Sequence, residues 1–82
     1  ETIVCAPNPF NEMLAIYIGG RELNANVELF TSDGKKVLSE EYSLTENNRT
    51  IYMNTSILTS GSYVVKVINA TVNESQIVIK AY

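Results

Sequence analysis

Apolar and polar residues alternate with a period of two along most of the chain, and the period of a helix is nearly absent. Most runs have one apolar face: Leu14, Ile16 and Ile18 share a face in MLAIYI, and Ile77 and Ile79 share one in QIVIKAY. Such a pattern is typical of antiparallel sheets with one side in water. Clusters of Gly, Asn, Asp or Ser separate seven predicted strands, at residues 2–6, 13–19, 25–31, 35–43, 49–54, 61–69 and 75–81.

The clearest turn signal is TSDGKK. Its Asp33-Gly34 pair favours a tight two-residue hairpin, because both central residues of such a turn take positive φ. The strands 25–31 and 35–43 are therefore expected to be antiparallel neighbours. Seven short strands in 82 residues predict an all-β fold, an immunoglobulin-like antiparallel β-sandwich, with a small closed barrel as the alternative.

The segment APNPFNEML places two prolines one residue apart before the second predicted strand. Pro7 and Pro9 remove amide donors from one side of an extended chain, while Asn8 and Phe10 still pair on the other. This predicts a stiff strand whose outer edge does not easily recruit another chain.

The length and the net charge of the chain exclude several classes of function. We expect one domain, residues 1–82, cut from a longer protein, because the chain begins at Glu1 without a methionine or a leader. No apolar run approaches the roughly 20 residues of a membrane span. Six basic residues against nine acidic ones give a net charge of −3, which argues against nucleic-acid binding.

Candidate catalytic and metal-binding residues are scarce. Cys5 is the only cysteine and there is no histidine, so neither a zinc cluster nor a Cys–His pair is available, and we expect a buried, structural Cys5. Asp33 is the only aspartate, which leaves no calcium loop. Glu40 and Glu41 are adjacent on a strand and point to opposite faces. We expect no enzyme, no cofactor and no metal.

Two surface features suggest modification or sugar binding. Sequons begin at Asn48, Asn54, Asn69 and Asn73, and five tyrosines invite comparison with a sugar-binding platform. These tyrosines fall on different predicted strands: Tyr17, Tyr42, Tyr52, Tyr63 and Tyr82. Tyr63, which follows LTSG, is instead typical of a tyrosine corner.

Four segments in order resemble one family. APNPFNEML, VELFTSDGKKVLSEE, MNTSILTSGSYVVKV and IVIK together are similar to the C-terminal sorting domain of the bacterial type IX (Por) secretion system, type A. The resemblance covers essentially the whole chain. The matching positions are Pro7, Asn8, Pro9, Asp33, Gly34, Lys35, Leu58, Gly61, Tyr63, Lys66, Ile77, Ile79 and Lys80.

The resemblance implies a non-catalytic secretion signal without a cofactor. Its cargo would pass through the periplasm of a Gram-negative, Bacteroidetes-type bacterium, cross the outer-membrane type IX translocon, and reach the cell surface or the extracellular space. A sortase would then cut at or before Glu1 and anchor the cargo to lipopolysaccharide. The implied partners are the translocon and the sortase, and exposed edge strands offer a surface for a homodimer.

The C-terminal strand is the expected recognition element. We hypothesise that a partner adds a strand along the edge of 75–82 and reaches Lys80, because a chain end is accessible. Family members commonly end on a basic residue, whereas this chain continues to Ala81 and Tyr82. A retained docking module, a carbohydrate-binding appendage and a purely structural sandwich therefore stay open as alternatives.

Overall fold

A computed structural model describes residues 3–81 and contains all seven predicted strands. They are β1 (Ile3–Ala6), β2 (Met13–Ile18), β3 (Asn24–Thr31), β4 (Lys36–Ser43), β5 (Thr50–Asn54), β6 (Gly61–Ile68) and β7 (Asn73–Lys80). The predicted ends differ from these bounds by no more than two residues, and residue 2 of the first predicted strand lies outside the described part.

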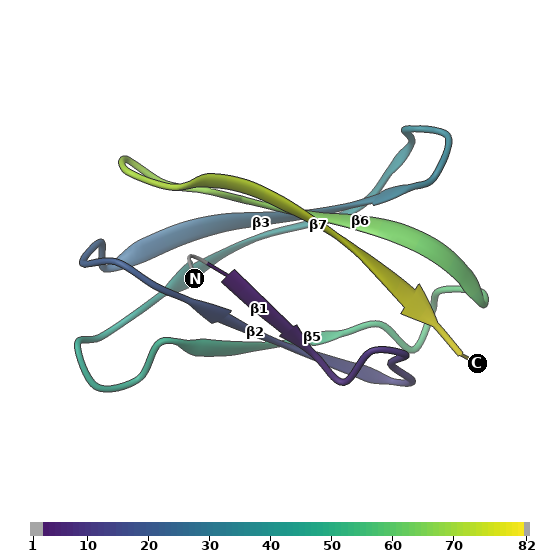
Figure 1. Cartoon of the computed structure of the whole chain (residues 1–82), viewed down its shortest axis with the longest axis horizontal. Helices are drawn as coiled ribbons and strands as arrows, with labels where there is room; N and C mark the ends of the chain where they lie inside the picture. The colour runs from purple at the N-terminus through teal and green to yellow at the C-terminus, as the bar shows by residue number, and fades with distance from the viewer. Residues whose placement is uncertain (1–2, 82) are drawn as a thin grey trace.

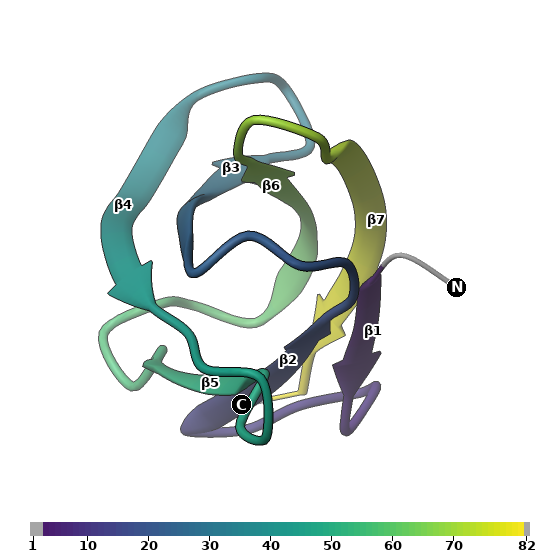
Figure 2. The same ribbon diagram turned by 90° about the vertical axis from the view of Figure 1, so that its left-hand side faces the viewer.

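The strands form two antiparallel sheets that pack face to face (Figure 1). One sheet has three strands in the order β1-β2-β5, and the other has four in the order β4-β3-β6-β7. The predicted immunoglobulin-like sandwich is confirmed. The alternative, a closed barrel, is not formed, because β4 and β5 are edge strands that do not pair with each other within residues 3–81 (Figure 2).

The core follows the two-residue period of the strands. Leu14, Ile16 and Ile18 of β2 are fully buried, as their shared face predicts. Cys5 is also buried, and burial raises the pKa of its thiol to about 11, so the side chain is a neutral part of the core. The buried apolar residues of both sheets form one continuous cluster.

In β7 the face that carries Ile77 and Ile79 points outward. These side chains are 67% and 47% exposed, while Val78 and Lys80 point inward. The cause is the register with β6, which pairs Val78 with the buried Tyr63. Because IVI is apolar on both faces, the pattern alone does not tell which face is buried.

The hairpin between β3 and β4 joins antiparallel neighbours as predicted, but its turn is longer than two residues. The Thr31 amide donates to the Lys35 carbonyl at 2.8 Å, and the Gly34 amide donates to the Thr31 carbonyl at 2.9 Å. Within this turn only Gly34 has a positive φ, at 97°, so the prediction of positive φ at Asp33 is wrong. The Thr31 hydroxyl favours this wider turn, because it donates to the Asp33 carboxylate and accepts the Lys35 amide at 3.0 Å.

The proline segment is a bend rather than a strand. β1 ends at Ala6, and the bonds preceding Pro7 and Pro9 are both cis. The chain then reaches the end of β7, where Phe10 forms a parallel bridge with Lys80. The prediction of a continuous stiff strand is therefore wrong, while the expected pairing of Phe10 is confirmed.

Candidate functional site

The two terminal motifs of the chain meet at one end of the sandwich. The Asn8 side-chain carbonyl accepts the Ile79 amide at 2.9 Å, and the Phe10 amide donates to the Ile79 carbonyl at 2.8 Å. The Ala81 amide donates in turn to the Phe10 carbonyl at 2.8 Å. We call this group the terminal clasp: Asn8, Phe10, Asn11, Ile79, Lys80 and Ala81.

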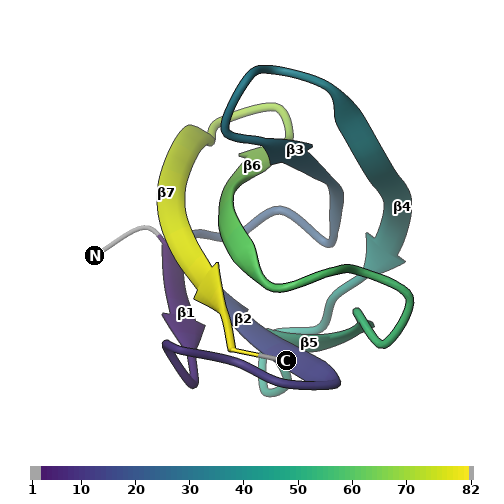
Figure 3. The same cartoon turned by 90° about the vertical axis from the view of Figure 1, so that its right-hand side faces the viewer.

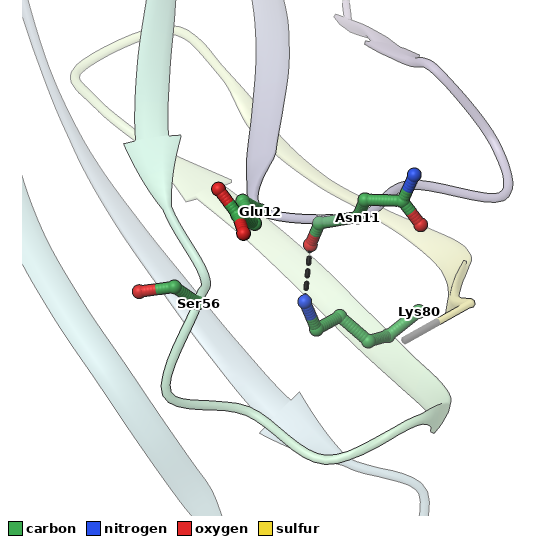
Figure 4. A pocket seen from close by; sticks show the side chains of 4 residues that line it. All are labelled: Asn11, Glu12, Ser56 and Lys80. Atoms are coloured by element: carbon green, nitrogen blue, oxygen red, sulfur yellow. Dashed lines mark hydrogen bonds between the residues drawn. The ribbon is translucent and has the colours of Figure 1, made fainter.

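Lys80 is the buried centre of the terminal clasp. Its side chain is only 2% exposed, and its ammonium donates to the Asn11 carbonyl (Figure 4). The ammonium also lies 5.9 Å from the centroid of the Phe10 ring, within range of a cation–π interaction. The same Asn11 carbonyl accepts the hydroxyl of Thr55 at 3.0 Å. One backbone oxygen therefore ties β7 and the segment after β5 to the proline segment.

The expectation that Lys80 is easily reached by a partner is wrong, because its side chain is buried, while its part in recognition stays a prediction. The backbone of Ile79 and the amide of Ala81 are already hydrogen-bonded, so the end of this edge is occupied, and the expected strand addition along the edge of 75–82 stays a prediction for the residues before Ile79. Tyr82 lies outside the described residues. What remains exposed at this strand end is the outward face with Ile77 and Ile79.

A hollow of about 550 Å³ opens beside the terminal clasp. It is lined by Asn11, Glu12, Ser56 and Lys80, as Figure 4 shows. The only ion pair among residues 3–81 joins Lys36 to Glu28 at 3.0 Å, so Glu12 does not form one with Lys80. The same residues contain no cluster of three potential metal-ligating His, Cys, Asp or Glu side chains.

Tyr63 forms the predicted tyrosine corner. Its hydroxyl donates to the Thr59 carbonyl at 2.6 Å, four residues upstream, and its ring is buried. Leu58 packs against the core beside this corner, and Gly61 begins β6 with a φ of 147°. These three motif residues support the fold.

Most motif residues gather at the same end of the molecule. The register aligns Thr31 of β3 with Tyr63 of β6 and Val78 of β7, which brings the hairpin, the tyrosine corner and the terminal clasp together (Figures 1 and 3). We call residues 7–12, 31–35, 58–63 and 77–81 the motif end. Lys66 is the exception, because it lies in mid-strand between Glu28 and Ser75.

The exposed part of the motif end is chemically mixed. Asp33 and Lys35 project from the hairpin tip, and hydrogen bonding by the Thr31 hydroxyl lowers the pKa of the Asp33 carboxyl. Pro7, Asn8 and Pro9 are exposed in the bend. Together with Ile77 and Ile79, these residues give the motif end exposed apolar, amide and charged groups.

Arg49 is a key residue that the sequence did not reveal. It is 9% exposed at the opposite end, where its guanidinium donates to the carbonyls of Ile18, Gly19, Glu22 and Thr45 at 2.8–3.3 Å. It thus holds together the loops before β3 and before β5. Arg49 follows two asparagines, and nothing in this local sequence distinguishes a buried arginine that binds carbonyls from an ordinary exposed one.

The outer face of the three-stranded sheet carries no charge. Its exposed side chains include Val4, Met13, Tyr17 and Tyr52. The register pairs Tyr17 with Thr50 and Ala15 with Tyr52, so the two tyrosines are diagonal neighbours on adjacent strands. Two of the tyrosines that the sequence places on different strands therefore share one surface.

The fold and the site define a class of protein: a small β-sandwich whose N-terminal and C-terminal motifs are hydrogen-bonded to each other at one end. The family model of the secretion system C-terminal sorting domain matches residues 5–81, and the chain belongs to that family. The resemblance seen in the sequence is thereby confirmed. A search of curated proteins found no match.

Membership in this family makes the chain a sorting signal of type IX secretion. Such a domain interacts with the secretion machinery, and the protein that carries it is exported to the cell surface or outside the cell. The family is one of sorting signals rather than of enzymes. Within residues 3–81 there is no helix long and apolar enough to cross a membrane.

Proposed function

We propose that this domain directs an upstream cargo from the periplasm through the outer-membrane type IX translocon and is then removed by a sortase. The cut lies upstream of Pro7, at or before Glu1, and the cargo is anchored to the surface of a Gram-negative, Bacteroidetes-type cell. The family match over residues 5–81 is the observation that carries the proposal.

We further propose that the secretion machinery reads exposed side chains of the motif end. The motif residues divide into two groups by burial. Tyr63 and Lys80 are buried and hold the fold, whereas Lys35, Ile77 and Ile79 are exposed. Recognition needs a surface that a partner can touch, so the exposed group is assigned to recognition and the buried group to stability.

A fusion tests the proposed fate of the cargo. Residues 1–82 with the native upstream linker are attached to a periplasmic fluorescent protein in a bacterium competent for type IX secretion. We expect the reporter at the cell surface with its mass reduced by that of the domain. The same fusion in a strain without the translocon is the control and should stay periplasmic.

A retained docking module is the alternative fate. A reporter that reaches the surface with the domain still attached would support it and would contradict cleavage. A reporter that stays periplasmic in the competent strain would contradict export of this cargo by the domain.

Sugar binding is the second candidate function. Tyr17 and Tyr52, 43% and 62% exposed on one uncharged sheet face, are the observation that favours it. Aromatic rings on a flat face stack on sugar rings, so binding would quench tyrosine fluorescence. A glycan panel that leaves the fluorescence unchanged would remove this alternative.

A further inference from the structure

One side of the sandwich lacks a strand. β4 and β5 are the edges of their sheets on this side, while β7 and β1 lie on the other (Figures 2 and 3). The register of β4 with β3 puts Leu38, Glu40 and Tyr42 on the inward face. The three-stranded sheet has no strand opposite β4, so Leu38 and Tyr42 are only half-buried and Glu40 is exposed.

The space between the two edges is a groove of about 230 Å³. β4 contributes one wall and the second half of β5 contributes the other. The lining residues are Leu38, Glu40, Tyr42, Tyr52, Met53 and Asn54. The lining therefore combines apolar and aromatic side chains with one amide and one carboxylate, and it shares no residue with the terminal clasp.

The β5 edge carries backbone groups ready for a further strand. The hydrogen bonds from the Ile18 amide to the Arg49 carbonyl at 2.9 Å and from the Thr55 amide to the Glu12 carbonyl at 2.8 Å fix which β5 residues face β2. By the alternation of an antiparallel ladder, the amide and carbonyl of Tyr52 face away from β2. They have no hydrogen-bond partner among residues 3–81.

We propose that this groove binds an extended peptide segment of another protein as a fourth strand beside β5. Its alternate side chains are small and apolar and pack on Leu38 and Met53. One lysine or arginine of the segment pairs with Glu40. Main-chain hydrogen bonds to Tyr52 supply affinity, and the pockets between side chains supply specificity.

Charge favours a basic partner over a second copy of this chain. Glu40 has no ion-pair partner among residues 3–81, and the chain as a whole carries a net charge of −3. Glu40 lines the groove, so its negative charge lies where the segment would pack. Burial, and secondarily this carboxylate, raises the pKa of Tyr42, which keeps the Tyr42 hydroxyl neutral. A second copy pairing through the same edge would bring together two chains that each carry a net charge of −3, which disfavours it relative to a basic segment.

Binding of a designed peptide to the 82-residue chain tests the proposal without any secretion assay, so it stands or falls independently of the proposed function. The probe is a short capped peptide of alternating valine and threonine with one central lysine. We expect it to slow hydrogen exchange at the Tyr52 amide, measured by NMR. The matched peptide with glutamate in place of lysine should bind at least about tenfold more weakly.

Substitutions locate the binding site. Tyr52→Pro removes both the outward amide and the Tyr52 ring that lines the groove while keeping the pairing with β2, and it should weaken binding at least about tenfold, whereas Tyr52→Thr, which loses the ring and keeps the amide, should weaken it less. Ser75→Pro makes the same kind of change on the outer edge of β7 and should leave binding unchanged. Glu40→Lys alters an exposed side chain, leaves the fold intact and should reverse the preference between the two peptides.

The contradicting outcomes are equally specific. The proposal is overturned if the lysine peptide leaves the Tyr52 amide unprotected, or if Glu40→Lys does not alter the charge preference. A dimer in solution that protects the same amide without peptide would assign the groove to a second copy of this chain and would also overturn the proposal.

Discussion

At the scale of single residues, the side chains of Lys80 and Arg49 stabilise the fold, although lysine and arginine are usually found at the surface. Lys80 and Arg49 are both nearly buried, and both donate to backbone carbonyls rather than to acidic side chains. A buried charge is costly unless its donors are satisfied. Each side chain therefore fastens one end of the sandwich, and each is expected to affect stability more than a surface cation does.

Substitutions at Lys80 test this structural role. Lys80→Ala removes the buried stem and the hydrogen bond to Asn11, and it should lower the free energy of unfolding by about 2–4 kcal/mol. Lys80→Met keeps most of the packing and should cost about 1 kcal/mol. Urea denaturation measures both. A Lys80→Ala chain as stable as the original would contradict the role of Lys80 in the terminal clasp.

The sequence predicted some residue roles and not others for a clear reason. Cys5 and Tyr63 lie in local patterns, an apolar run and a turn before a strand, that determine their surroundings. The surroundings of Lys80 and Arg49 depend on loops far away in the sequence. Lysine and arginine are mostly exposed in proteins, so the general expectation of an exposed side chain is wrong at both positions.

At the scale of elements, the β3–β4 hairpin depends on one glycine. Gly34 has a φ of 97°, and a Cβ placed there would meet no atom within 4 Å, so the cost of a side chain is backbone strain alone. Gly34→Ala should lower stability by about 1–2 kcal/mol, and Gly34→Asn should cost less because asparagine tolerates positive φ better. Thermal unfolding of both variants checks the order, and equal stability of all three chains would contradict it.

The strands themselves were largely predictable, because alternation and turn residues are local signals. The sequence did not predict which face of β7 is buried or where the proline segment leads. Ile77, Val78 and Ile79 make both faces of β7 apolar, so only the pairing with β6 determines which face is buried. The bend at Pro7 is fixed by distant hydrogen bonds to Ile79, and no local pattern contains that information.

At the scale of the whole molecule, the two sheets are unequal and the two ends differ. The motif end gathers segments that are far apart in the sequence, and the side between β4 and β5 lacks a covering strand. The residues that line the groove are not among those of the motif end. The domain is thus able to present its sorting motif and a peptide-binding groove at the same time.

The measurement that tests the central claim is the export of the fluorescent fusion with two matched double substitutions. Lys35→Ser with Ile77→Ser changes an exposed cation and an exposed apolar residue at the motif end. Arg21→Ser with Leu23→Ser makes the same chemical change at the opposite end. Urea denaturation first establishes that both variants remain folded.

If the secretion machinery reads the motif end, surface-exposed reporter falls at least about tenfold for the Lys35 and Ile77 pair and stays unchanged for the Arg21 and Leu23 pair. Equal export of the two folded variants would contradict the claim that the exposed motif end is the recognition surface.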